Sequence, residues 1–173
     1  MKNYKKVVIK IGSALISENS VASSSFIKDL SNQISMLNKK IQFIIVSSGA
    51  ISQGMNILDI INKPKDLEAL QALAAIGQQR LMGLYEKSFN EVDILIAQVL
   101  LTHDDMNDHS KYKNAKATIE KLLDLNVVPI INENDVVATE EIKFGDNDKL
   151  AAMVSNLINA DLMIIKILVK VIF

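Results

Sequence analysis

The sequence contains no cysteine, and neither sign of charge dominates it. Without cysteine the chain can form neither disulfide bonds nor cysteine-ligated zinc sites, and it has no thiolate nucleophile. The 19 Lys and Arg residues nearly balance the 20 Asp and Glu residues, which leaves a formal net charge of -1. Such a charge provides no overall attraction to nucleic acid or to anionic lipid. Function must therefore reside in a local site.

Long hydrophobic runs are absent as well. The longest, such as QFIIVS and LMIIKILVKVIF, fall short of the roughly 20 residues that a membrane helix needs, so we expect no membrane span. No basic stretch with an apolar segment and a small-residue cleavage site marks the N-terminus, and the expected location is the cytoplasm. With 173 residues, 49% of them hydrophobic, the chain is long enough for one domain with a real core.

Short apolar runs rich in Val and Ile alternate with segments of helical spacing. Such runs suit strands buried on both faces, and their alternation with helices predicts an α/β domain with a mainly parallel sheet flanked by helices. VATEEIKF breaks the pattern and predicts a short β-hairpin near 137–144. The predicted strands are Lys6–Ile11, Gln42–Ser47, Asp93–Leu101, Val127–Ile131 and Leu162–Ile165, and helical spacing covers 27–37, 70–84, 119–123 and 150–158.

The loops that follow the predicted strands are the places to look for a site. In open α/β sheets, ligands bind at the carboxyl ends of the strands, on the loops that lead into the next helices. These loops read GSALIS, SSGAISQG and THDDMNDHSKY, and the fourth is an acidic stretch that ends in FGDND.

The segment VVIKIGSAL places a cation inside an apolar strand. Burying Lys10 is costly unless an anion or a carboxylate meets it. The alternative is an edge-strand lysine whose ammonium group extends to water. Gly12 allows the backbone to approach a phosphate closely, but it is equally consistent with a plain turn. Neither the P-loop motif nor the G-x-G-x-x-G motif is present, so any phosphate chemistry belongs to another fold.

In IIVSSGAISQG, a predicted strand ends in serine and glycine just before a predicted helix. Backbone N–H groups at a helix start bind carboxylate or phosphate, and Ser48 adds a hydroxyl donor. Serine and Gly49 are also common cap and turn residues, so a purely structural role stays open. A nucleophilic serine is disfavoured, because no G-x-S-x-G motif is present and both histidines, His103 and His109, are expected to be solvent-exposed.

The stretch INENDVVATEEIKFGDND, residues 131–148, is the strongest local signal. Its six carboxylates are accompanied by one cation, Lys143. GDNDKL alone is typical of a helix start, where the helix dipole favours Asp. Carboxylates and amides crowded after a buried strand, however, also suit recognition of a substrate amino group and positioning of a cationic side chain.

Taken together, these segments resemble the amino acid kinase family. The resemblance is carried, in the expected order and to about residue 165, by VVIKIGSALI, IIVSSGAISQG, LQALAAIGQQRLM, AQVLLTHDDMNDHSKYKNA, VVPIINENDVVATEEIKFGDNDKLAA and ADLMII. INEND followed by FGDND is specific to the members that act on L-glutamate. The resemblance implies a three-layer sandwich and, with Mg²⁺ accompanying ATP, phosphorylation of the glutamate γ-carboxylate as the first step of proline synthesis.

The resemblance also assigns roles to residues. Lys10, with Gly12, would meet the transferring phosphoryl group of ATP, and Asp148 would hold the catalytic lysine in place. Lys143 would lie in a flap over glutamate, and no residue is assigned as a metal ligand. Asp135 can pair with the substrate ammonium group, which argues against a relative that acts on acetylated glutamate. The implied glutamate-binding residues are Ser48, Gly49, Asn132, Asp135 and Asn147.

The resemblance further implies homo-oligomers and feedback inhibition by proline. We expect residues 1–165 to be the N-terminal part of an amino acid kinase domain and residues 166–173, KILVKVIF, to be a divergent tail. A glycine-rich nucleotide loop and a second catalytic lysine are expected next and do not follow. A catalytically inactive glutamate-binding fragment that lacks the nucleotide half is therefore the alternative to an active kinase.

Overall fold

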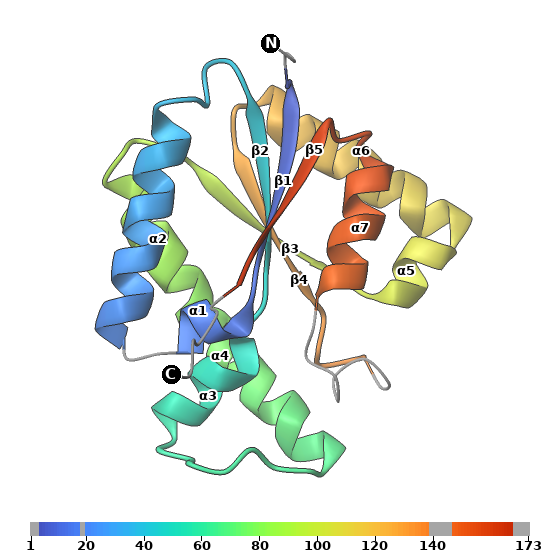
Figure 1. Cartoon of the computed structure of the whole chain (residues 1–173). Coiled ribbons are helices and arrows are strands. Elements are labelled where there is room, and N and C mark those ends of the chain that lie inside the picture. Colours follow the sequence, from blue (N-terminus) through green and yellow to red (C-terminus); the bar gives the residue numbers. More distant parts are fainter. Residues whose placement is uncertain (1–3, 18–19, 139–146, 168–173) are drawn as a thin grey trace, which may run out of the picture.

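In the described part of the chain, five parallel strands form one sheet (Figure 1). The structure, a computed structural model, describes residues 4–17, 20–138 and 147–167. The strand order is β3-β4-β2-β1-β5, which confirms the predicted α/β class with a parallel sheet. The strands are β1 (Lys6–Ile11), β2 (Gln42–Ser47), β3 (Ile96–Leu101), β4 (Val128–Glu133) and β5 (Leu162–Lys166).

The strands begin and end close to where the sequence predicts them. β1 and β2 have the predicted bounds, and they pair from Lys6 with Gln42 to Ile11 with Ser47. β3 starts later than predicted, because Asp93 adopts a positive φ of 55° in the turn before it. β4 continues beyond the predicted end and includes two polar residues that are buried. The predicted hairpin near 137–144 lies, from residue 139 onward, outside the described residues.

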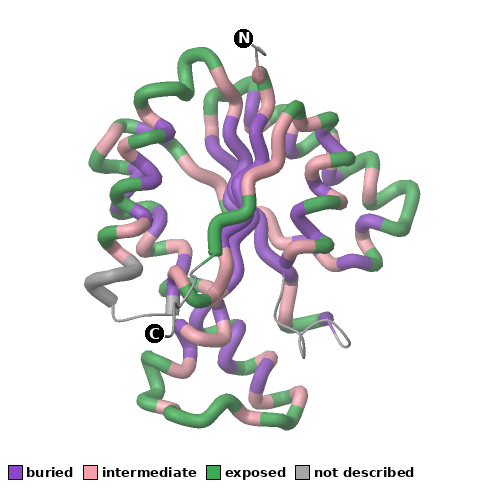
Figure 2. The backbone as a smooth tube through the Cα atoms, viewed as in Figure 1, coloured by how far each residue is buried: buried purple, intermediate pink, exposed green. Residues whose placement is uncertain are grey.

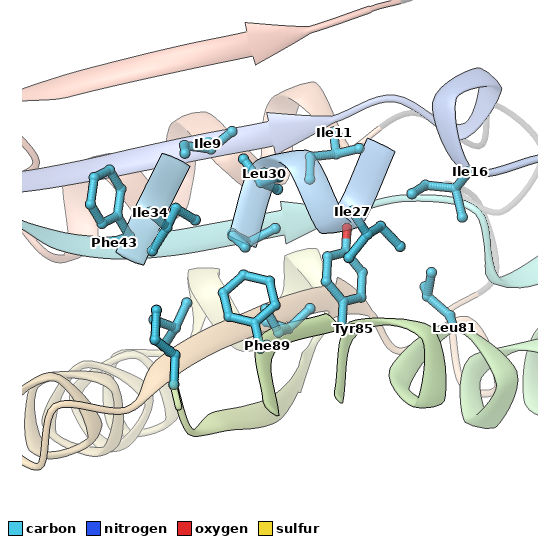
Figure 3. Close-up of a cluster of buried hydrophobic side chains, with 14 of the residues drawn as sticks. Ile9, Ile11, Ile16, Ile27, Leu30, Ile34, Phe43, Leu81, Tyr85 and Phe89 are labelled. Atoms are coloured by element: carbon cyan, nitrogen blue, oxygen red, sulfur yellow. The ribbon is translucent and has the colours of Figure 1, made fainter. Parts of the chain in front are cut away.

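Helices cover both faces of the sheet and complete three layers (Figure 1). On one face, α2 (Ser20–Ser35) and α4 (Leu67–Asn90) pack against alternate residues of β1 such as Ile9 and Ile11. Figure 3 shows Tyr85 and Phe89 of α4 facing this cluster. On the other face, α6 (His109–Asp124) and α7 (Asp148–Leu157) pack against Val8 and its neighbours.

Two short helices follow the first two strands, α1 (Ser13–Ser17) and α3 (Ala50–Ile57). α3 packs on α4 with almost no space between the backbones. A Cβ atom added at Gly77 of α4 would lie 1.8 Å from the carbonyl oxygen of Ala50. One added at Gly54 would lie 2.1 Å from the carbonyl oxygen of Leu73. These glycines fix the position of α3 beside the carboxyl edge of the sheet.

The segment THDDMNDHSKY, predicted to be a loop, is helical instead. It forms α5 (His103–Asn107) and the first turn of α6. Thr102 and Asp105 form a reciprocal capping box, and the Asp108 side chain accepts a hydrogen bond from the Lys111 N–H at 2.8 Å. Side-chain oxygens at both helix starts therefore satisfy backbone groups that a loop would leave to water.

Burial is uneven across the sheet. The central strands are buried on both faces, whereas β5 forms one edge and is partly exposed (Figure 2). Ile165 in β5 is 44% exposed, and Ile167 directly after the strand is 62% exposed. No helix in the described part of the chain is both long enough and apolar enough to cross a membrane.

Candidate active site

A pocket at the carboxyl edge of the sheet brings together residues from three of the predicted loops. Its volume is about 480 Å³ when the space that opens to solvent at its mouth is included. All of the predicted glutamate-binding residues line it. The lining residues are Ser13, Ser48, Gly49, Ala50, Ile51, Ser52, Met55, Lys63, Asn132, Asp135 and Asn147. The parallel strands explain the convergence, because their carboxyl ends meet at one edge.

Two asparagines form the buried floor of this pocket. The Asn147 side-chain Nδ2 donates to the carbonyl oxygen of Ser47 at 2.8 Å and to Asn132 Oδ1 at 2.7 Å. Asn132 Oδ1 also accepts the backbone N–H of Glu133 at 2.9 Å. Both amide protons of Asn147 are therefore used inside the protein. Only its Oδ1 remains to meet a ligand, and an oxygen acceptor suits an ammonium group.

The start of α3 also lines the pocket. Gly49 precedes the helix with a positive φ of 112°, and a Cβ atom there would lie 3.0 Å from Ile16 Cγ2. Gly49 provides no side-chain cap, and the first residues of the helix, Ala50, Ile51 and Ser52, line the pocket, so their N–H groups have no side-chain cap within the part of the chain that is described. The Ser48 hydroxyl is buried there and has no hydrogen-bond partner among the described residues. These donors suit a carboxylate or a phosphate.

Asp135 is the acidic group of the pocket. It lies in a turn after β4 in which the Ala138 N–H donates to the carbonyl oxygen of Asn134 at 3.1 Å. Burial, and then the nearby Glu133 carboxylate, raise the pKa of Asp135 to about 6, although the Lys63 ammonium acts in the opposite direction. A carboxylate in such surroundings is stabilised when a ligand supplies positive charge.

Lys10 lies beside the pocket and forms an ion pair with Asp148. Its Nζ is 2.6 Å from Asp148 Oδ1, and the lysine side chain is only 4% exposed. The interpretation of Lys10 as an edge-strand lysine extending to water is therefore wrong, because β1 lies between β2 and β5. A Cβ atom added at Gly12 would lie 4.0 Å from Lys10 Nζ. Gly12 therefore lies next to the ammonium group.

The prediction that His103 is solvent-exposed is also wrong. His103 is 4% exposed, its backbone N–H donates to Glu133 Oε1 at 3.2 Å, and its Nδ1 lies 3.2 Å from Glu133 Oε2. His109 is exposed, as predicted. The buried His103–Glu133 pair ties the start of α5 to the end of β4, directly before the turn that carries Asp135.

Some site residues carry no clear signal in the sequence. Lys63 lies in the polar segment NKPKD, where its charge resembles that of any surface lysine, yet it lines the pocket. Gln78 lies within the helical spacing of α4, and its Oε1 accepts from Asn132 Nδ2 at 2.8 Å. Lys143 of the predicted flap lies outside the described residues. In the part that the structure describes, no group of three or more His, Cys, Asp or Glu residues could hold a metal ion.

These features define the structural class of the protein. It is a three-layer α/β protein with a polar pocket at the carboxyl edge of a parallel sheet. The amino acid kinase family profile matches residues 5–172. The chain therefore belongs to the amino acid kinase family, which confirms the resemblance carried by its motifs.

Curated relatives identify the branch of the family to which the chain is similar. It is 46% identical over 167 residues to the glutamate 5-kinase of Azoarcus sp. (strain BH72), and equally so to that of Nitrosospira multiformis. It is 42% identical to the glutamate 5-kinase of Geobacter sp. (strain M21). Each alignment covers 95% of this chain but only 45% of the relative, so the chain spans less than half the length of these proteins.

A solved structure supports the fold independently of these sequences. The UMP kinase from Ureaplasma parvum superposes with a TM-score of 0.59, covering 94% of this chain and 68% of that one. At 19% identity this likeness concerns the fold alone.

Proposed function

We propose that this protein takes part in phosphorylating the γ-carboxylate of L-glutamate with ATP, giving glutamyl 5-phosphate. The observation that carries the proposal is a single pocket lined both by Asp135 and by the start of α3, where Gly49 provides no side-chain cap. Glutamate has an ammonium group and a carboxylate on one carbon, and these walls match the two charges. The similarity to glutamate 5-kinases supports the same substrate.

In this proposal the pocket distinguishes the two ends of glutamate. Asp135 and Asn147 Oδ1 accept from the α-ammonium group, while Ser48 and the N–H groups after Gly49 donate to the α-carboxylate. The γ-carboxylate then extends toward Lys10, which lies beside the pocket on the same edge of the sheet. It needs no general base, because a carboxyl group with an ordinary pKa of about 4.3 is ionised at neutral pH.

The residues near Lys10 fit the terminal phosphate of a nucleotide. The Lys10 ammonium is held by Asp148 and lies close to Gly12, so it can neutralise negative charge on phosphoryl oxygens. Mg²⁺ bound to ATP would add further charge neutralisation.

The proposal is tested by ATP-dependent formation of glutamyl hydroxamate, together with calorimetric titration of glutamate into the same preparation. We expect hydroxamate from L-glutamate and none from N-acetylglutamate, which lacks the ammonium group that Asp135 would bind. Binding of glutamate without hydroxamate would instead assign the protein to the alternative, a glutamate-binding protein without phosphoryl transfer. Absence of both binding and product would refute the proposal.

A further inference from the structure

We propose that Gln78 is a positioning residue for ligand recognition, which fixes the amide groups of Asn132 and Asn147 from behind the pocket. The identity of the ligand as an amino acid rests on the proposed function. The positioning role rests on a continuous set of hydrogen bonds that joins α4 to the pocket floor. Gln78 itself does not line the pocket, so it would act only through the asparagines.

The hydrogen bonds have a fixed direction. The Glu133 N–H can only donate and the Ser47 carbonyl can only accept, so these two backbone groups determine which atoms of Asn132 and Asn147 are oxygen and which are nitrogen. Asn132 Nδ2 must then find an acceptor, and Gln78 Oε1 supplies it at 2.8 Å. Gln78 Nε2 in turn donates to Gln98 Oε1 at 3.3 Å, which keeps the Gln78 oxygen turned toward Asn132.

Asn132 is the residue that depends most on this arrangement. It is 3% exposed, so water cannot readily replace a lost acceptor. Without Gln78 Oε1, rotation of the Asn132 amide to satisfy its Nδ2 elsewhere would remove the oxygen that holds Asn147 Nδ2. Asn147 could then present N–H to the pocket in place of oxygen, which is the wrong group for a cationic ligand.

The packing of α4 against α3 fixes the position of Gln78. Its neighbour Gly77 touches the backbone of α3, where any Cβ atom would collide with the Ala50 carbonyl oxygen. One turn of α4 therefore sets both walls of the pocket, with Gly77 placing the start of α3 and Gln78 placing the asparagines. We infer that this turn determines the distance between the groups that bind the two charges of the ligand.

The test compares Gln78→Met, which keeps the length of the side chain and removes the amide, with Gln79→Met at the exposed next position. Calorimetric titration with L-glutamate should show affinity reduced about tenfold in Gln78→Met and unchanged in Gln79→Met. Gln78→Glu keeps the acceptor for Asn132 Nδ2 and should recover most of the affinity. NMR signals of the Asn132 and Asn147 side-chain amides should shift in Gln78→Met and not in Gln79→Met.

The outcomes separate this inference from the proposed function. If the wild-type protein binds glutamate and Gln78→Met binds it equally well, the positioning role is refuted while the proposed function stands. If the wild-type protein does not bind glutamate, the proposed function fails, and the amide signals alone decide whether Gln78 fixes the asparagines. If Gln78→Met does not fold, the affinity of Gln78→Glu tests the inference instead. Gln78→Glu keeps the acceptor for Asn132 Nδ2, so weak glutamate binding by a folded Gln78→Glu would overturn the positioning role.

Discussion

Asp135 is a carboxylate placed where its charge is unfavourable until a ligand arrives. Its pKa of about 6 means that it becomes protonated as the pH falls through that value. We therefore expect glutamate affinity to fall between about pH 7 and about pH 5, above the pKa of about 4.3 expected for the γ-carboxyl group of the ligand. Asp135→Asn should bind more weakly and lose this pH dependence. Calorimetric titrations at a series of pH values measure both effects, and an unchanged pH profile in Asp135→Asn would contradict the assignment.

The raised pKa of Asp135 also means that its negative charge lowers the stability of the ligand-free protein. Because its folded pKa is raised from 3.8, the folded state holds a proton that the unfolded state releases, and stability falls as the pH rises through about 4 to 6. Asp135→Asn should thus be more stable at neutral pH, by about 1–3 kcal/mol. Urea denaturation measures the difference, which should vanish near pH 4. A variant less stable than the wild type at neutral pH would contradict this prediction.

Lys10 should contribute to turnover more than to binding. If it neutralises the transferring phosphoryl group, Lys10→Met should lower kcat far more than it raises the KM for glutamate, because the interaction grows in the transition state. Asp148→Asn should produce the same pattern more weakly, since it removes the carboxylate 2.6 Å from Lys10 Nζ. Lys149→Met, at the exposed next position, is the control. Near-normal kcat in Lys10→Met would assign Lys10 a structural role only.

Among the packed helices and strands, the contact between α3 and α4 leaves the least room for added side-chain atoms. A Cβ atom at Gly77 would lie 1.8 Å from the Ala50 carbonyl oxygen, whereas one at Gly83 of the same helix meets nothing within 4 Å. We expect Gly77→Ala to lower the free energy of unfolding by at least about 2 kcal/mol and to weaken glutamate binding. Gly83→Ala should instead stabilise the protein by up to about 1 kcal/mol. Urea denaturation of both variants checks this, and equal effects would show that α3 can shift freely.

Helices and strands with a strong hydrophobic pattern could be predicted from the sequence. Those that depend on contacts with residues distant in the sequence could not. β1 and β2 are apolar runs with a turn or loop on each side, so their bounds follow from composition. α5 was missed because its polar sequence resembles a loop, and its burial depends on a capping box and on the facing Glu133. The motifs also indicated residues that line the pocket, such as Asp135 and Asn147, whose role in binding remains a prediction. The motifs give no sign of Gln78, because its hydrogen bond to Asn132 joins residues 54 positions apart.

For the whole molecule, the free edge of β5 is the most exposed apolar feature of the sheet. Within the described residues β5 pairs only with β1, and Ile165 is 44% exposed. Unpaired strand edges favour association with other chains. We expect concentration-dependent self-association, measured by light scattering, that Ile165→Lys reduces. Leu95→Lys, at another exposed apolar position that is 66% accessible, should leave it unchanged. Equal effects of the two substitutions would exclude the β5 edge as the contact.

The position of β1 between β2 and β5 also has a consequence during protein synthesis. β1 ends at Ile11, yet the strand on its far side is complete only at Lys166, about 155 residues later. At roughly 5–20 residues per second, a ribosome needs on the order of 10–30 s to cover that distance. For this time the strand that carries Lys10 has at least one unpaired edge on the nascent chain, and a chaperone that recognises extended apolar segments can bind it there.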